Sequence, residues 1–167
     1  MFFAGFIGAF MVFRFGAEAW PPPGQPRLPL NVTTANTLIL LLSGITMAAT
    51  LWFLRKRSQA KVMRGLFLTT FLGIIFLTVQ GYEWVRLVKF GLTITHGVFG
   101  STFYTLIGCH GLHVAGAVLW LFIILIRHRV RAQVNIERAN LGIRLASMYW
   151  FLVVALWPVL FVLVYLD

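Results

Sequence analysis

Cysteine and acidic residues are nearly absent from this chain of 167 residues, which has one cysteine and four aspartates and glutamates in total. The single Cys109 excludes an intrachain disulfide and a site built from several thiolates, and the sequence has no C-x-x-C-H motif for covalent attachment of haem. Charged residues make up 11% of the chain, whereas soluble domains carry about 25%. These shortages exclude a soluble globular domain, a disordered chain and a disulfide-rich scaffold.

Apolar residues dominate instead, at 60% of the chain, and the mean hydropathy is +0.89. They form long uncharged runs rather than the short alternating segments of a membrane β-barrel, and a helix needs about 20 mostly apolar residues to cross a membrane. The sequence therefore predicts an all-α transmembrane protein, a single domain over residues 1–167 with five membrane helices. The runs that predict these helices are residues 1–13, 28–54, 65–82, 90–126 and 145–166.

Two of these runs do not have the length of one helix. Residues 1–13 are too few to cross the membrane, so we expect a spanning helix whose start precedes the sequence given. Residues 17–19 match a signal-peptide cleavage pattern, but the run before them lacks the positive first region of such a peptide. The run 90–126 is too long for one upright helix, and its first residues predict an outer loop that ends where a helix begins near Gly97.

Basic residues give the chain a formal net charge of +10, and ten of the fourteen fall into two connections between apolar runs. The connection after the second helix holds Arg55, Lys56, Arg57, Lys61 and Arg64, and that after the fourth holds Arg127, Arg129, Arg131, Arg138 and Arg144. The positive-inside rule places both in the cytoplasm, so we expect Lys56 and Arg129 to face the cytoplasm and Gln25 and Asp167 to face outward. Orientation and contact with anionic lipid explain the charge without a nucleic-acid partner.

Glu83 lies on the predicted third helix, whereas the other three acidic residues lie in predicted connections or at the chain end. A carboxylate at the bilayer centre costs about 2.5–3.5 kcal/mol, so such a residue is a functional candidate that needs a partner. At about 1.5 Å per residue, Glu83 and His110 lie at similar depth on consecutive helices, and we expect a contact there that Gln80 can join. The alternative is an interfacial carboxylate beside Arg86.

His110 and His113 are three residues apart and share one face of the predicted fourth helix. Two histidines suggest a metal or haem, but such a site needs three or four ligands. The other two histidines, His96 in the outer loop and His128 in the cytoplasmic loop, are predicted on opposite sides of the membrane. We therefore expect no metal site and no catalytic residue, and interpret the pair as buried side chains hydrogen-bonded to neighbouring helices.

Small residues interleave with the histidine pair, chiefly Gly108 and Gly111, and favour a close packing seam on that face. Three tryptophans near the predicted interfaces, Trp20, Trp84 and Trp150, are interpreted as aromatic-belt anchors. From the residues alone, the chain is a five-helix membrane protein with a polar cluster, and no reaction is named.

Four motifs, in order along the chain, make it resemble subunit III of the haem-copper oxidases, most of all cytochrome c oxidase subunit III in its short bacterial form. The first two are the proline loop Trp20-Pro21-Pro22-Pro23-Gly24 and the segment Gln80-Gly81-Tyr82-Glu83-Trp84, which is similar to the family's Q-x-x-E-aromatic pattern. The most specific are Gly97-Val98-Phe99-Gly100-Ser101-Thr102-Phe103-Tyr104 and Gly108-Cys109-His110-Gly111-Leu112-His113-Val114. The resemblance implies a polar cluster of Gln80, Glu83, His110 and His113 and a helix-packing motif of Gly100, Ser101, Gly108 and Gly111.

Two departures from the family pattern limit what carries over. The family has a buried carboxylate just upstream of the segment matched by Met1, and that position precedes this sequence. In the last helix the family usually has a histidine after Tyr-Trp and an aspartate three residues later, where this chain has Phe151 and Val154. A role of that histidine and aspartate in the family is therefore not expected for this chain, whereas the packing role of the last helix is.

The resemblance implies an accessory, non-redox subunit of a proton-pumping respiratory terminal oxidase in the aerobic electron transport chain, which oxidises cytochrome c and reduces oxygen to water. It implies subunits I and II as partners that hold the haem and copper, bound phospholipid, and a place in the bacterial cytoplasmic (inner) membrane. The alternatives are the equivalent subunit of a quinol oxidase or nitric oxide reductase and, from another class, a small proton-coupled transporter. A transporter is disfavoured because the sequence shows no inverted repeat.

Overall fold

The computed structural model describes residues 2–16, 30–89 and 97–165, and these residues form five helices and no strand. The helices are α1 (Phe2–Phe15), α2 (Leu30–Arg55), α3 (Gln59–Lys89), α4 (Gly97–Val134) and α5 (Ile136–Tyr165). The last four are long and apolar enough to cross a membrane, whereas α1 has 14 residues. The predicted all-α fold of five helices is confirmed, and four of the five have the length and composition of membrane spans within the described residues.

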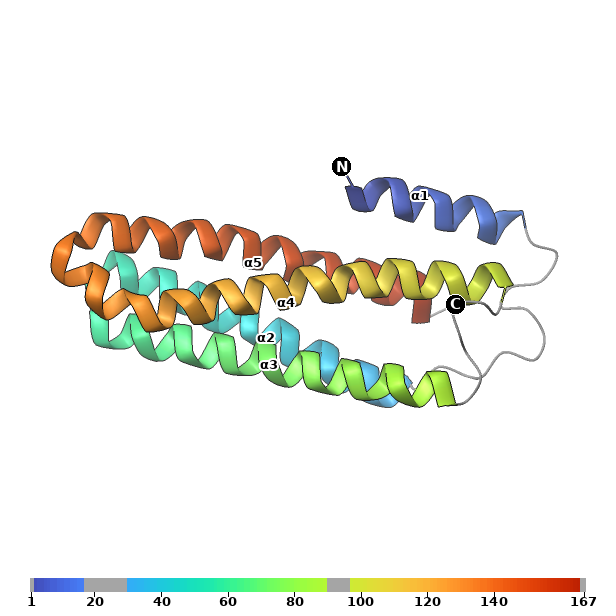
Figure 1. The fold of residues 1–167 in the computed structure, drawn as a ribbon, viewed down its shortest axis with the longest axis horizontal. Helices are drawn as coiled ribbons and strands as arrows, with labels where there is room; N and C mark the ends of the chain where they lie inside the picture. Colours follow the sequence, from blue (N-terminus) through green and yellow to red (C-terminus); the bar gives the residue numbers. More distant parts are fainter. Residues whose placement is uncertain (1, 17–29, 90–96, 166–167) are drawn as a thin grey trace.

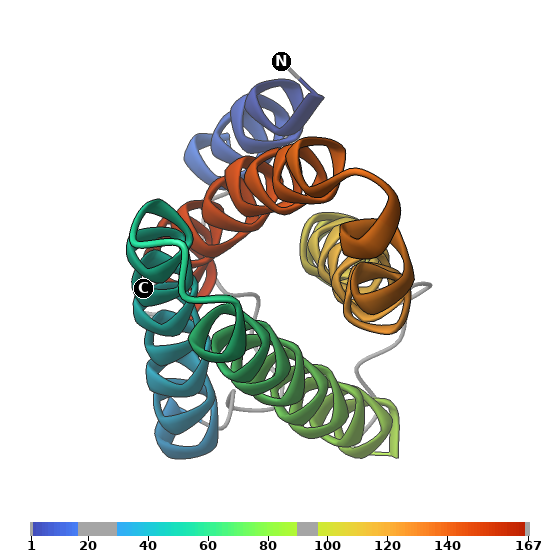
Figure 2. The same ribbon diagram turned by 90° about the vertical axis from the view of Figure 1, so that its left-hand side faces the viewer.

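Helices α2 to α5 form an antiparallel bundle, and α1 lies outside it (Figure 1). Each of α2 to α5 packs against the next along the chain, and α2 also packs against α5, so that the four helices close a ring (Figure 2). Helix α1 packs on α4, and Nη1 of Arg14 donates a hydrogen bond to the carbonyl oxygen of Leu163 in α5 at 3.4 Å. The last four helices therefore form the bundle, and the first packs on its outside and adds the buried side chains of Phe3 and Phe10 to the core.

The two basic connections lie at the same end of the bundle, at the left of Figure 1, but they are far shorter than predicted. Only residues 56–58 separate α2 from α3, and only Asn135 separates α4 from α5. Eight of the ten basic residues predicted in these loops lie on helices instead, namely Arg55, Lys61, Arg64, Arg127, Arg129, Arg131, Arg138 and Arg144. Lysine and arginine are good helix formers, so the end of an apolar run marks the edge of the membrane and not the end of the helix.

Local hydrogen bonds explain why both turns are tight. After α2, the amide of Ser58 donates to the carbonyl of Phe53 and the amide of Arg57 to that of Leu54, each at 3.1 Å, which is the Schellman pattern of a helix end. Arg57 has a φ of 54°, in the left-handed region where this motif favours glycine. Before α5, the side chain of Asn135 accepts a hydrogen bond from the amide of Arg138 at 3.0 Å and caps the helix.

Two tryptophans of α5, Trp150 and Trp157, are fully buried and are the largest side chains of the core. The interpretation of Trp150 as an interfacial anchor was therefore wrong. Its ring lies over Gly73 of α3, where an added Cβ would stand 2.7 Å from the ring and 2.8 Å from Val118 of α4. Glycine is needed there because helices α3, α4 and α5 meet at that point.

Candidate functional site

A polar contact between α2 and α3 lies inside the bundle and was not anticipated from the sequence. The side chains of Asn36 and Gln80 are both buried, and Nδ2 of Asn36 donates to Oε1 of Gln80 at 3.3 Å and to the carbonyl oxygen of Phe76 at 3.2 Å. Gln80 thus has its partner on α2, not on α4. The signal in the sequence was the asparagine itself, because an amide inside an apolar run needs a buried partner.

Glu83 lies one turn further along α3 and is 3% exposed. Its Oε1 lies 3.9 Å from Nη1 of Arg86, and its Oε2 has no hydrogen-bond partner among the described residues. The structure therefore shows the pairing with Arg86 that was the alternative. The hydrogen bond to His110 that the depth argument suggested is not formed within the described part of the chain, since neither ring nitrogen of His110 has a partner there.

His110 and His113 lie on one face of α4, as predicted, and meet aromatic rings. The ring of His110 stacks on Trp157 of α5 with centroids 5.1 Å apart, and its edge approaches Phe3 of α1. Nδ1 of His113 bonds the carbonyl oxygen of Cys109 in the same helix at 2.7 Å, and its ring lies 5.1 Å from that of Phe3. The interhelical hydrogen bonds expected for His110 are replaced by ring contacts that hold α1 and α5 against α4.

Trp157 contacts side chains of several helices in this region, and the sequence analysis did not identify it as a site residue. Its Nε1 donates to Oγ1 of Thr37 in α2 at 2.8 Å, while its ring contacts His110 and lies edge-on to Phe76 of α3. One side chain therefore contacts three other helices. No spacing rule finds such a residue, since α5 is apolar on all sides and its inner face is not visible in the sequence.

No three histidine, cysteine, aspartate or glutamate side chains come together in a metal-binding arrangement within the described ranges. His128, predicted in a cytoplasmic loop, lies on α4 and is 4% exposed, because that helix continues to Val134. His96 lies outside the described residues, as does the proline loop of Trp20, Pro21, Pro22, Pro23 and Gly24.

The predicted packing seam of α4 receives a side chain from α3. An added Cβ would stand 2.8 Å from the ring of Trp84 at Gly111 and 3.9 Å from it at Gly108. Trp84 is thus half-buried against α4. Gly100 belongs to the first turn of α4, and the nearby Ser101 is half-buried.

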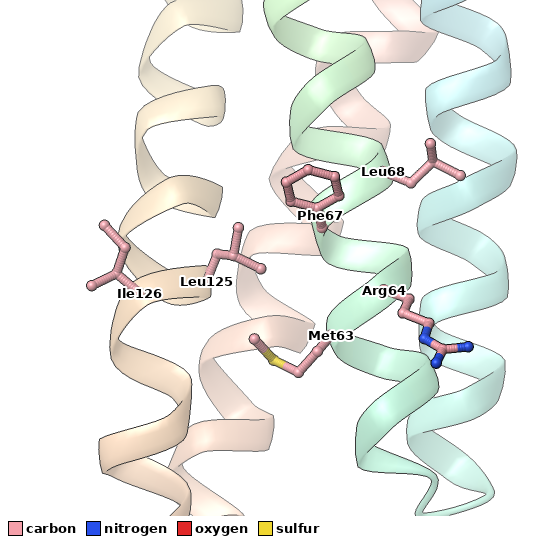
Figure 3. A pocket seen from close by; sticks show the side chains of 6 residues that line it. All are labelled: Met63, Arg64, Phe67, Leu68, Leu125 and Ile126. Atoms are coloured by element: carbon pink, nitrogen blue, oxygen red, sulfur yellow. The ribbon is translucent and has the colours of Figure 1, made fainter.

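A groove of about 690 Å³ lies along α3 and α4 near the basic end (Figure 3). The residues that line it are Met63, Arg64, Phe67, Leu68, Leu125 and Ile126. Phe67, Leu68 and Ile126 are exposed, and Arg64 is the one charged side chain of the six. An apolar groove with a cation at its end, on helices that cross the membrane, has the chemistry to hold a lipid.

Fold and polar contacts together define a class. This is a multi-pass helical membrane protein with a few buried hydrogen bonds between its helices, while most of its buried hydroxyl side chains bond within their own helix, and many large apolar side chains are exposed along its spans.

Comparison with known proteins narrows the class to one family. Residues 1–167 match the family described as cytochrome c oxidase subunit III, and the chain belongs to that family. It is 37% identical to cytochrome c oxidase subunit 3 of Synechocystis over 98% of this chain and 69% of the relative. It is 33% identical to the Bacillus subtilis protein of the same name over 98% of this chain and 78% of the relative, and 34% identical to that of Locusta migratoria over 99% and 63%.

Proposed function

We propose that the chain is an accessory, non-redox subunit of a cytochrome c oxidase of the aerobic respiratory chain, in the bacterial cytoplasmic membrane. Family membership over the whole chain is the observation that carries this proposal. Subunits I and II are the proposed partners, they hold the haem and copper, and cytochrome c is the electron donor to the complex. Curated relatives with the name cytochrome c oxidase subunit 3 favour this donor over quinol.

The polar groups of the described residues support a structural role. Hydrogen bonds between helices are formed by the side chains of Asn36, Gln80 and Trp157. The ring of His113 bonds the carbonyl oxygen of Cys109 in its own helix. Exposed apolar side chains along the spans, such as Leu38, Phe71 and Leu152, need lipid or another subunit beside them. We propose that this surface packs on subunit I and that the groove of Figure 3 holds a lipid chain. Such support would sustain proton uptake and the durability of the complex during turnover.

The orientation proposed from the basic residues is compatible with this role. The turns between α2 and α3 and between α4 and α5 lie at one end of the bundle, with the basic residues on and beside them, and this end faces the cytoplasm in the proposal. A single cysteine placed at Lys56 is expected to resist a membrane-impermeant thiol reagent added from outside, whereas one placed at Gln25 is expected to react. The natural Cys109 is replaced by serine in both variants. The reverse labelling pattern would contradict the orientation.

Co-purification tests the assignment to an oxidase. A tag on this chain is expected to recover haem-copper oxidase spectra and activity with reduced cytochrome c. Activity with quinol alone would favour a quinol oxidase, recovery with nitric oxide reduction would favour a nitric oxide reductase, and solute flux through the purified chain without haem would favour a transporter.

A further inference from the structure

Two pockets adjoin between α2 and α5 at the basic end of the bundle, away from the groove between α3 and α4. One has a volume of about 520 Å³ and is lined by Leu54, Arg55, Arg57, Glu137, Asn140, Leu141 and Arg144. The other has a volume of about 230 Å³ and is lined by Leu51, Leu54, Arg55, Arg144, Ser147, Met148 and Phe151. Because Leu54, Arg55 and Arg144 line both, the two pockets form one site with a polar mouth and an apolar slot.

The polar mouth carries positive charge. Three arginines and one glutamate line it, all four exposed, so its charged side chains sum to +2. Arginine presents a planar set of donors that matches a phosphate, and two or three such groups around one pocket bind an anion far better than scattered cations. Asn140 adds an acceptor, since its Oδ1 is buried without a hydrogen-bond partner in the described residues. The mouth therefore suits a phosphate that carries a hydroxyl-bearing group.

Arg57 occupies a backbone position that favours glycine. Its φ of 54° places it in the left-handed region, which is costly for residues with a Cβ. Glycine at this point of the Schellman motif would close the same turn without that cost. Strained backbone conformations are concentrated at functional sites, where a particular side chain is required. At this position the side chain is that of Arg57, the third arginine that lines the mouth.

The apolar slot runs from the mouth into the depth of the membrane. Arg55 ends the apolar span of α2 and Arg144 directly precedes the uncharged residues 145–166, so we expect these arginines at the level of the lipid phosphates. Leu51 and Met148 lie four residues further into their helices than Arg55 and Arg144, which is about 6 Å along each axis. Met148 is 69% exposed at the side of the slot. A phosphate at the mouth thus has an apolar path for a hydrocarbon chain directly beneath it.

The geometry points to a phospholipid of net negative charge as the ligand of this site, with its phosphate among Arg55, Arg57 and Arg144 and one acyl chain beside Met148 and Phe151. A zwitterionic lipid would bring a cation of its own to a mouth of net positive charge, and an acidic peptide from a partner would leave the slot unfilled. The site depends on neither the oxidase assignment nor the groove of Figure 3.

Native mass spectrometry of the delipidated complex, isolated through a tag on this chain, tests the proposal with phosphatidylglycerol and phosphatidylcholine as probes. Phosphatidylglycerol is expected to bind more tightly than phosphatidylcholine. The double variant Arg55→Gln/Arg144→Gln is expected to weaken its binding about 25-fold, at about fivefold for each arginine. The single variant Arg144→Gln is expected to weaken binding about fivefold, and Arg138→Gln, which removes the same single charge from α5 outside both pockets, is its matched control, with a change below twofold expected. Equal losses in the two single variants, or equal binding of the two lipids, would overturn the proposal.

A second variant separates binding from folding. Arg57→Gly relieves the left-handed strain, so the melting temperature is expected to rise while phosphatidylglycerol binding falls about fivefold. Unchanged binding in this variant would contradict the role of Arg57. A photo-crosslinking residue placed at Leu141, which is 55% exposed at the mouth, is expected to capture lipid. Capture of a protein subunit there would show an interface and overturn the lipid assignment.

Discussion

The contact of α2 with α3 and the contact of α3 with α4 and α5 both depend on glycine, but different groups fill the space that glycine leaves. Between α2 and α3, Gly65 faces the small hydroxyl side chain of Thr50. Between α3 and the later helices, Gly73 and Gly111 face the rings of Trp150 and Trp84. The Thr50 side chain is small and can turn away from an added methyl group at the cost of its hydrogen bond to the carbonyl of Thr46, whereas the fully buried indole ring of Trp150 has little room to move. The aromatic interface should therefore tolerate change far less than the hydroxyl interface.

Gly73→Ala should have the largest effect. Its new methyl group would overlap Trp150 and Val118, on two different helices, so relief at one contact does not relieve the other. We expect a loss of about 3 kcal/mol in the free energy of unfolding, at the upper end for an overpacked core. Denaturant titration in detergent micelles measures this loss. A change below about 0.5 kcal/mol would show that the three helices do not meet closely at Gly73.

Trp157→Phe should have the second largest effect, a loss of about 2 kcal/mol in the free energy of unfolding. The change removes the hydrogen bond from Nε1 to Thr37 and leaves a cavity beside His110. The oxygen of Thr37 keeps its own bond to the carbonyl of Thr33 at 2.8 Å, so no polar group is orphaned. The same titration checks this value, and the double variant Trp157→Phe/Thr37→Val should lose little more than the single one.

Gly111→Ala should cost about 1.5 kcal/mol, because only one ring, that of Trp84, meets the new methyl group. Gly116 lies on the same helix with nothing within 4 Å of an added Cβ, so Gly116→Ala is the matched control and should be neutral or stabilising. If Trp84 is the cause, Trp84→Leu in the same chain should reduce the cost of Gly111→Ala. Equal costs in both backgrounds would mean that Trp84 does not occupy this seam.

Thr69→Val should have the smallest effect, a loss of about 0.6 kcal/mol in the free energy of unfolding. It tests the interface between α2 and α3, where hydroxyl side chains meet. The substitution removes the 2.8 Å hydrogen bond between Thr46 and Thr69 but keeps the shape of the side chain. Thr78→Val is the control, since the hydroxyl of Thr78 bonds only within its own helix and is exposed. A loss for Thr69→Val as large as that for Gly73→Ala would erase the difference between the two interfaces.

The helices could be predicted from the sequence because hydropathy reports directly on membrane thickness. Their ends could not, since basic residues such as Arg64 and Arg127 continue a helix beyond the end of its apolar run. The direction in which a side chain points could not be predicted where a helix is apolar on all sides. For this reason Trp150 was interpreted as an interfacial anchor, although it is buried in the core. Polar residues gave partial information: the sequence singled out Gln80 and Glu83 as buried candidates, but not that Asn36 is the partner of Gln80.

Selective removal of this chain from the isolated oxidase tests the central claim, that the chain supports the complex without holding a redox centre. The depleted complex should keep its haem spectrum, its metal content and its initial rate of oxygen reduction. It should then lose activity faster during sustained turnover or pump fewer protons per electron, and adding the chain back should restore both. Loss of a haem band or of a stoichiometric metal on removal would contradict the account.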